Sequence, residues 1–412
     1  MKQHLIRPEL LAPAGNLDKL KMAFTYGADA VYIGGESFSL RVAADNFTLD
    51  EIREGVEFAH ARGKKVYLTA NIIPHNKDLE EYKEYLPKVK ETGIDAVILS
   101  DLGMFSITRE LAPELEIHVS TQANNVNYES ANMWHRLGAK RVILAREMSL
   151  KEIGEIRRQV SPQLELEAFV HGAMCISYSG RCLLSNYLAG RDSNQGNCAH
   201  PCRWKYHLME ETRPGEYMPV FENERGTFIY NSKDLCMIAH IDDLIRSGLT
   251  SFKIEGRVKS EYYVATVIGA YRRAIDAFME NPDTYTFDPS LLEELKKVSH
   301  RDYTTGFYYG RPDGKQQHYE NSSYIRTYDM VGIVTHYDPE TKLARVTQKN
   351  RFFTGSQVEF LLPTGKFFTQ TIDFMTDENG TPITVANRPQ STVLIRCDQP
   401  VEPDTFLRQE KK

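Results

Sequence analysis

Long apolar runs, a basic excess and abundant cysteine are all missing from this sequence, and each absence removes a class of protein. No apolar run approaches the length of a membrane span, so we expect no membrane protein. The 50 Lys and Arg residues against 56 Asp and Glu give a net charge of −6, which argues against a broad basic surface that binds nucleic acid. Any nucleic-acid site must therefore be local.

Cysteine is limited to six residues in 412, and the sequence opens with Met1-Lys2-Gln3-His4, without an apolar signal segment. We therefore expect a reducing, cytoplasmic setting in which disulfides are disfavoured. A mean hydropathy of −0.44 and 41% hydrophobic residues indicate an ordinary globular protein. The length suggests two or three domains.

Four of the six cysteines fall close together: Cys175, Cys182, Cys198 and Cys202 lie within 28 residues, separated by six, fifteen and three residues. Thiolates suit both zinc and iron–sulfur centres. Zinc sites usually present two tight cysteine pairs, whereas the long, uneven gaps here favour an iron–sulfur cluster that collects ligands from separate loops. Zinc remains the alternative metal, and Cys236 is an alternative ligand to Cys202.

Short β-branched apolar runs alternate with amphipathic stretches over the first 280 residues, which is typical of a parallel sheet wrapped by helices. Eight strands are predicted, at residues 10–14, 30–34, 65–71, 96–100, 117–122, 141–145, 164–171 and 251–255. A helix over residues 260–279 follows them. Eight such units predict a (β/α)8 TIM-like barrel. An open doubly wound sheet is less favoured, because no glycine-rich phosphate motif follows the first strand.

Polar residues gather where the predicted strands end, and barrel active sites lie at the carboxyl ends of strands. Capping of the following helices is the alternative role for any one of them. From this set and its neighbours we assign catalytic roles to His171, Glu167, Glu255, Arg257 and Gln122. Substrate-binding roles are assigned to Arg41, Asn71, Arg146, Arg181, Arg203 and Lys253.

The four clustered cysteines lie in the connection between the seventh and eighth strands, within a segment that we call the cysteine loop (residues 171–207). Four basic residues stand there against the single acidic Asp192: Arg181, Arg191, Arg203 and Lys205. Their charge either neutralises an electronegative cluster or binds an anionic substrate. Cys397, far along the chain, is expected to be a buried core thiol.

The remaining chain divides into three further segments. A polar hairpin is predicted over residues 208–230, so that the barrel domain spans residues 1–281. Residues 282–330 form a connecting segment in which tyrosines alternate with basic residues, a pattern that either stacks unpaired bases or packs on the barrel. Alternating short strands and turns over residues 331–412 predict a small all-β domain, a β-barrel or sandwich.

Several motifs together resemble the collagenase-like peptidase family of unassigned catalytic type. They are Leu11-Ala12-Pro13-Ala14-Gly15-Asn16, Glu167-Ala168-Phe169, Gly172-Ala173-Met174-Cys175, Gly180-Arg181-Cys182 and Lys253-Ile254-Glu255-Gly256-Arg257. Within that family the chain is most similar to the branch that hydroxylates the wobble uridine of tRNA. The resemblance implies a four-cysteine iron–sulfur cluster of the 4Fe-4S type, held by Cys175, Cys182, Cys198 and Cys202.

The resemblance also implies the substrates: a tRNA anticodon loop, and prephenate as the source of the hydroxyl group that makes 5-hydroxyuridine. A related subunit of the same family is a further implied partner. Two other functions stay open. One is peptidase activity, although neither a His-Glu-x-x-His nor a Gly-x-Ser-x-Gly string occurs. The other is a non-catalytic tRNA-binding protein with a structural zinc.

Overall fold

The protein is represented by a computed structural model that describes residues 5–40, 46–175, 177–179, 181–204, 222–223, 226–227, 233–310 and 324–411. The predicted 208–230 hairpin lies largely outside these residues. Its described part is a short antiparallel pair, β8 (Glu222–Asn223) with β9 (Gly226–Thr227).

Eight parallel strands close into a barrel, as the sequence pattern predicts. The barrel strands are β1 (Glu9–Pro13), β2 (Ala30–Gly34), β3 (Lys65–Thr69), β4 (Ala96–Leu99), β5 (Glu116–Val119), β6 (Arg141–Ile143), β7 (Glu165–Ala173) and β11 (Ser251–Ile254). Each pairs in parallel with its neighbour, and β11 pairs with both β7 and β1, which closes the ring. The (β/α)8 prediction is confirmed, and the open doubly wound sheet is excluded.

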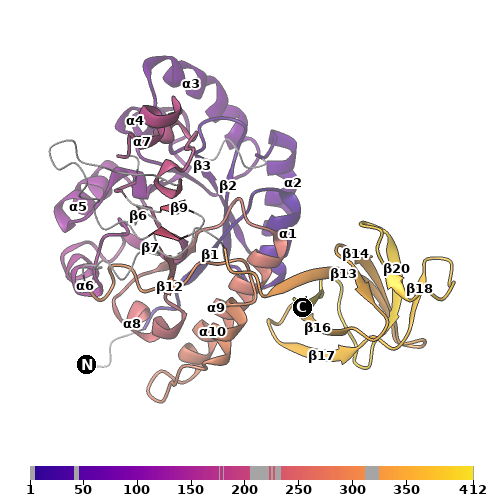
Figure 1. The fold of residues 1–412 in the computed structure, drawn as a ribbon. Helices are drawn as coiled ribbons and strands as arrows, with labels where there is room; N and C mark the ends of the chain where they lie inside the picture. Colours follow the sequence, from indigo (N-terminus) through magenta and orange to yellow (C-terminus); the bar gives the residue numbers. More distant parts are fainter. Residues whose placement is uncertain are drawn as a thin grey trace.

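Helices alternate with these strands and surround the barrel (Figure 1). They are α1 (Leu17–Thr25), α2 (Leu49–His60), α3 (Asn76–Lys90), α4 (Leu102–Leu111), α5 (Tyr128–Leu137), α6 (Leu150–Gln159), α8 (Ile241–Arg246) and α9 (Glu261–Glu280). Local signals set their ends: Thr48 and Glu51 form a capping box at α2, and Ser260 caps the predicted long helix α9. Gly138 ends α5 with φ +106°, a conformation that other residues seldom adopt.

Strand β7 is longer than its neighbours and continues beyond the barrel. Its last residues pair antiparallel with β10 (Asp234–Cys236), which in turn pairs with β12 (Tyr303–Thr304). Helix α10 (Ser290–Leu295) packs nearby, and Leu291, Leu295 and Tyr308 belong to the barrel core. The first part of the predicted connecting segment 282–330 is thus integrated into the barrel wall, as expected if its aromatics pack there.

The C-terminal region is an antiparallel all-β domain, which confirms that prediction. Seven strands form one sheet in the order β17 (Phe367–Thr371), β16 (Gln357–Leu361), β21 (Phe406–Glu410), β13 (Tyr328–Asp338), β14 (Leu343–Gln348), β20 (Thr392–Arg396) and β18 (Met375–Asp377). A separate pair joins β15 (Phe352–Phe353) to β19 (Val385–Ala386). Cys397 is fully buried in this domain's core, as predicted.

The C-terminal domain docks on α1, α9 and α10 through polar contacts as well as apolar ones (Figure 1). The hydroxyl of Tyr26 donates to the carbonyls of Leu361 and Asp404 at 2.9 Å. Arg408, fully buried, binds Glu294 on α10 at 2.8 Å and Glu359 on β16 at 2.7 Å. A buried ion cluster therefore links the two domains.

Within the described residues, no helix is both long enough and apolar enough to cross a membrane.

Replacing Arg408 with Ala should lower the free energy of unfolding by about 3 kcal/mol, because it removes the buried guanidinium that binds both Glu294 and Glu359 and leaves them only Lys297 as a cation, at 3.3 and 2.8 Å. Urea denaturation followed by circular dichroism measures the change. The matched control is Lys411→Ala, whose partner Asp329 is 3.4 Å away and similarly exposed; its effect should stay within about 0.5 kcal/mol. Equal effects of the two variants would contradict a structural role for the buried cluster.

Candidate active site at the carboxyl end of the barrel

A pocket of about 540 Å³ opens where the barrel strands end. Residues from seven of the eight strands or their following loops line it, which is where barrel enzymes place their chemistry. The lining residues are Tyr32, Leu40, Thr69, Asn71, Ile98, Ser120, Thr121, Gln122, Ile143, Arg146, Phe169, Ser179, Lys253, Glu255 and Arg257. Six residues with predicted roles are among them: Asn71, Gln122, Arg146, Lys253, Glu255 and Arg257.

Three cations and one carboxylate give the pocket its charge. Arg146 binds Glu255 at 2.7 Å, and its guanidinium lies 4.0 Å from the ring centre of Phe169. The ammonium of Lys253 lies 4.3 Å from the ring centre of Tyr32. With Arg257 the cations outnumber Glu255, so the pocket favours an anionic ligand.

Arg257 is held in place by the loop that follows β2. Its guanidinium donates to Asn46 Oδ1 at 2.8 Å and to Thr69 Oγ1 at 3.1 Å, and it also contacts the Ser39 hydroxyl. Gly34, the last residue of β2, leaves room for this side chain, because a Cβ there would lie 2.1 Å from Arg257 Nη2. A larger residue at position 34 would displace the arginine.

Two amide side chains offer hydrogen-bond acceptors to a ligand. Asn71 donates to Ser120 Oγ at 3.3 Å, while its buried Oδ1 atom has no hydrogen-bond partner among the described residues. The same holds for the Oε1 atom of Gln122, a buried residue. Because unpaired buried acceptors are costly, each of these oxygens would be stabilised by a ligand hydroxyl group that donates to it. The pocket is thus suited to an anion that also donates hydrogen bonds.

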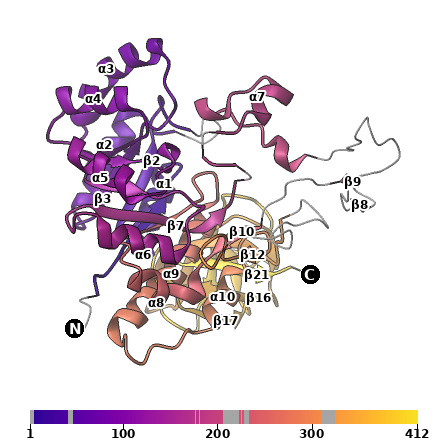
Figure 2. The ribbon, with the colours of Figure 1, turned by 90° about the vertical axis from the view of Figure 1, so that its left-hand side faces the viewer.

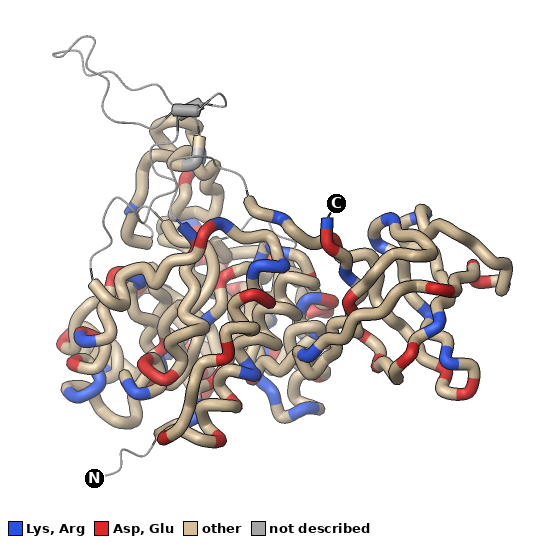
Figure 3. Tube along the Cα trace, turned by 60° about the horizontal axis from the view of Figure 1, so that its bottom comes forward, with Lys and Arg blue, Asp and Glu red and all other residues tan. Residues whose placement is uncertain are grey.

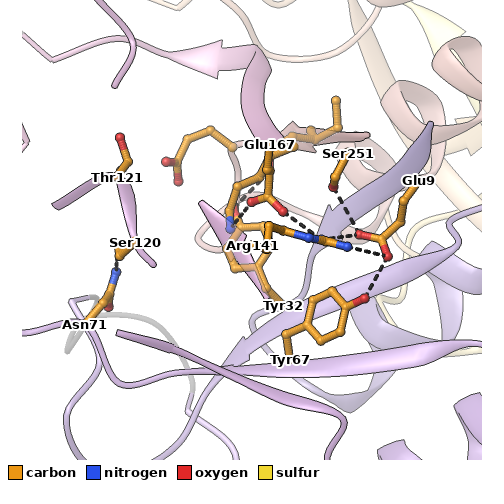
Figure 4. A network of polar contacts seen from close by, with 12 residues as sticks. Glu9, Tyr32, Tyr67, Asn71, Ser120, Thr121, Arg141, Glu167 and Ser251 are labelled. Atoms are coloured by element: carbon orange, nitrogen blue, oxygen red, sulfur yellow. Dashed lines mark hydrogen bonds and ion pairs between the residues drawn. The ribbon is translucent and has the colours of Figure 1, made fainter. Parts of the chain in front are cut away.

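Below the pocket, the barrel interior holds a network of buried charges (Figure 4). The Arg141 guanidinium lies 2.6 Å from Glu9, 2.6 Å from Glu165 and 2.9 Å from Glu167. Glu167 also accepts from Lys253 Nζ at 2.9 Å. The network therefore extends from the entrances of β1, β6 and β7 up to a cation of the pocket.

Glu167 is fully buried between Arg141 and Lys253 and does not line the pocket. Burial by itself would raise the pKa of its carboxyl, but the charges of Lys253 and Arg141 outweigh burial and lower the pKa to about 2. Burial lowers the pKa of Lys253, and the Glu167 carboxylate opposes that shift. Glu167 therefore positions Lys253 and does not itself reach a ligand in the pocket.

His171 also lies away from the pocket, although it ends the predicted seventh strand. Its ring packs 5.5 Å from both Tyr271 and Tyr303, and its Nδ1 atom lies 3.4 Å from the Tyr271 hydroxyl. Burial lowers its pKa to about 3, which keeps the imidazole neutral. A break in the alternation of β7 explains this placement. Regular alternation would put His171 on the same face as Phe169, which lines the pocket, but the register shift opposite Lys253 and Ile254 turns His171 towards α9.

The cysteine loop is attached to the rim of the barrel at two points. Asn124, after β5, donates to the Ser179 carbonyl at 3.0 Å, and Ile73, after β3, donates its backbone N–H to the Asn194 carbonyl at 3.1 Å. A second, smaller pocket lies beside the first. Its lining residues are Thr121, Arg146, Glu147, Met174, Cys175, Ser177 and Ser179. Thr121, Arg146 and Ser179 line both pockets, so Cys175 adjoins the main one.

The six cysteines form two groups by burial. Cys175 is exposed, and Cys182, Cys198 and Cys202 are partly exposed. The backbone N–H of His200 donates to the Cys198 sulfur at 3.4 Å. The donor set of this loop fits a thiolate-bound metal. Among the residues that the structure describes, however, no three His, Cys, Asp or Glu side chains are gathered as ligands of one ion.

Cys236 belongs to the other group. It lies in β10 opposite His171, and burial raises the pKa of its thiol to about 12. Since a metal ligand must be a thiolate, this environment makes Cys236 a core residue and argues against its suggested replacement of Cys202.

The other predicted substrate-binding residues lie outside the pocket or outside the residues that the structure describes. Arg181 is exposed on the cysteine loop, Arg203 lies in a short turn of that loop (Pro201–Arg203), and Arg41 falls outside the described residues. Tyr32, Phe169 and Ser179 were not predicted. The alternation of β2 and β7 places Tyr32 and Phe169 in the interior and was a usable signal, whereas only the folded loop brings Ser179 to the rim.

Two family models account for nearly the whole chain. Residues 15–318 match peptidase family U32, and residues 326–408 match the U32 C-terminal domain. The chain belongs to peptidase family U32.

Curated U32 relatives align along most of this chain. The chain is 42% identical to "tRNA hydroxylation protein P1" of Bacillus subtilis, in an alignment that covers 98% of this chain and 95% of the relative. It is also 42% identical to "tRNA hydroxylation protein P" of Escherichia coli, in an alignment that covers 97% of this chain and 95% of the relative. The "23S rRNA 5-hydroxycytidine C2501 synthase" of Escherichia coli is 37% identical over 66% of this chain and 40% of its own length.

The U32 name refers to peptidases, and a cysteine peptidase would need a thiol beside an imidazole. Here Cys175 lines the smaller pocket while His171 packs among Tyr271 and Tyr303. The geometry of the described residues therefore does not favour that activity.

Replacing Glu167 with Gln should lower the free energy of unfolding at pH 7 by about 3–5 kcal/mol, because Arg141 and Lys253 lose a buried anion. In the wild type the stability due to the Glu167 charge is fully present above about pH 4.5 and is lost as the pH falls towards 2. The variant should therefore show a flatter dependence of stability on pH over this range. Urea denaturation across a pH series measures both effects. Glu155→Gln, at an exposed position on α6, is the matched control, and an identical pH slope in wild type and E167Q would contradict the assignment.

Proposed function

We propose that this protein modifies tRNA, replacing the C5–H of a wobble uridine with C5–OH to make 5-hydroxyuridine without molecular oxygen. Prephenate is the proposed hydroxyl source, and an iron–sulfur cluster the proposed cofactor. The names of the relatives support RNA hydroxylation as the reaction class. The observation that carries the proposal is the shared wall between the cation-rich pocket and the pocket lined by Cys175.

The cation-rich pocket has the chemistry that prephenate requires. Prephenate carries two carboxylates and one hydroxyl group, and Arg146, Lys253 and Arg257 provide positive charge for the former. The buried oxygens of Asn71 and Gln122, which lack a partner among the described residues, are candidate acceptors, and the hydroxyl would donate to one of them. Phe169 and Tyr32 add ring surface against which an apolar ring can pack.

Cys175, Cys182, Cys198 and Cys202 would hold the cluster in the cysteine loop. Hydroxylation oxidises the uracil ring by two electrons, so prephenate would serve both as the source of the oxygen atom and as the two-electron acceptor, and the bound cluster would supply electron transfer between the two. Arg146 lines both pockets, so it would orient the anionic donor beside that centre while Glu255 holds the guanidinium at 2.7 Å. Glu167 would keep Lys253 in place beneath the donor.

The macromolecular substrate would be an anticodon loop in the cytoplasm, with its uridine turned out of the stack. The proposal includes a related U32 subunit as a further partner. Peptidase activity and a structural zinc are the competing assignments, and metal analysis separates them.

Replacing Cys175 or Cys198 with Ala should abolish 5-hydroxyuridine, because each change removes a proposed cluster ligand. Two measurements test this. One is iron and sulfide analysis of anaerobically purified protein, where the wild type should hold about four of each per chain. The other is nucleoside analysis of tRNA from a deletion strain that carries each variant. Cys397→Ala, in the C-terminal core, is the matched control and should retain both. One zinc per chain without sulfide would refute the cluster and favour structural zinc.

Replacing Arg146 with Gln should weaken prephenate binding by about 10- to 100-fold, since a charge-assisted hydrogen bond is lost. Isothermal titration calorimetry of the anaerobic protein measures this dissociation constant. The control, Arg158→Gln, changes an exposed arginine on α6 and should leave binding unchanged. Equal affinities of R146Q and wild type would rule out the pocket as the donor site.

A further inference from the structure

The cysteine loop exposes large aromatic and apolar side chains that are not packed into the protein core. Tyr187 is 85% exposed, Leu183 69%, Tyr178 46% and Trp204 41%. Figure 2 shows helix α7 (Leu184–Ala189) of this loop standing away from the barrel. Exposed apolar groups concentrated in one segment indicate an interaction surface.

Local contacts hold this segment in a defined conformation. The buried Ser185 hydroxyl accepts a hydrogen bond from the Ala199 N–H at 2.9 Å. This bond links α7 to the segment just before the short turn Pro201–Arg203. Arg191 donates to Asn197 Oδ1 at 3.0 Å, and Ser193 donates to the Cys182 carbonyl at 2.7 Å. The aromatic side chains are therefore exposed on a segment whose backbone is held in place by hydrogen bonds.

The charge of the same surface is opposite to that of the whole chain. Arg181 and Arg191 are exposed there, and the single acid Asp192 accepts from Asn186 at 2.5 Å. The chain as a whole has a net charge of −6, and Figure 3 shows charges of both signs interspersed over the barrel and the C-terminal domain. Aromatic rings beside arginines are the combination that stacks unpaired bases and binds phosphates.

We propose that Tyr178, Tyr187 and Trp204, with Arg181, form the face that binds the unpaired nucleotides of the RNA substrate. This inference rests on the proposed function and names the element that receives the RNA. We call these four residues the stacking face. It assigns RNA binding to the cysteine loop, in place of the aromatic connecting segment 282–330.

The position of Tyr178 supports this assignment. Its neighbours Ser177 and Ser179 line the pockets, and Asn124 fixes the Ser179 carbonyl to the barrel rim. A base stacked on Tyr178 would therefore lie at the mouth of the site, so that an adjacent nucleotide could enter it. The contacts that hold Tyr178 also hold the start of the metal-binding segment, which couples RNA position to the reacting centre.

Binding of a fluorescent anticodon stem–loop RNA to the full-length, anaerobically purified protein tests the proposal. Tyr187→Ala should weaken binding by about 5- to 100-fold, the range seen when one base-stacking ring is lost. Tyr187→Phe keeps the ring and should bind like wild type. Arg181→Gln should weaken binding and reduce the slope of log K against log salt by about 0.7, the loss of one phosphate contact.

The comparison variant is Phe353→Ala, which removes from the C-terminal domain a ring that is 46% exposed, the same fraction as Tyr178. If F353A loses affinity and Y187A does not, RNA binds the C-terminal domain and the proposal is overturned. Unchanged affinity in both Y187A and Tyr178→Ala also overturns it. Circular dichroism and iron content, unchanged in Y187A, confirm that a loss of affinity arises at the surface.

Nucleoside analysis of tRNA from the complemented deletion strain separates this inference from the proposed function. Absence of 5-hydroxyuridine with the wild-type chain refutes the function, and with it the stacking face as a substrate site. Normal 5-hydroxyuridine together with full RNA affinity in Y187A refutes the stacking face alone. If Y187A instead disrupts self-association, measured by size-exclusion chromatography, while RNA affinity is kept, the face binds a second protein chain and the RNA assignment falls.

Discussion

The buried guanidinium of Arg141 is the interaction on which the barrel interior depends. It joins carboxylates from β1 and β7 across the ring, and Tyr67 on β3 and Ser251 on β11 bind the same Glu9 at 2.7 and 3.0 Å. An isolated buried charge would be very costly, so each member requires the others. A network of this kind specifies which strands meet, and it delivers a fixed cation, Lys253, to the floor of the pocket through Glu167.

Above this floor, the structure places two kinds of chemistry side by side. One wall carries cations and unpaired amide oxygens suited to a small, hydroxylated anion. The adjoining wall carries Cys175 and the start of the cysteine loop. Arg146 belongs to both walls, and its contacts with Glu255 and Phe169 restrict it to one position. The site thus combines a rigid barrel with a loop that is tied to the rim at Asn124 and Ile73.

Much of the fold could be predicted because the signals are local. Strand-length β-branched runs and the amphipathic stretches between them depend on near neighbours in the chain, and they located all eight barrel strands to within a few residues. Predictions failed where a strand changes direction or length. Gln122 was placed in a strand, whereas Ser120 turns the chain into a short 3-10 helix after Val119. The catalytic roles of His171 and Glu167 stay predictions; in the structure His171 turns towards α9, and Glu167 forms ion pairs below the pocket.

The sequence by itself determined the barrel class, the all-β C-terminal domain, the single cysteine-rich loop and a list of polar residues at strand ends, because these follow from periodicity and spacing. Tertiary structure alone decided which of those residues face one another. Strand closure between β7 and β11 selects Lys253 and Arg257 for the pocket, and the register shift at the end of that pairing excludes His171. Burial separates Cys236 from the four cysteines of the loop. These distinctions depend on contacts between residues tens to hundreds of positions apart, which only the closed barrel brings together.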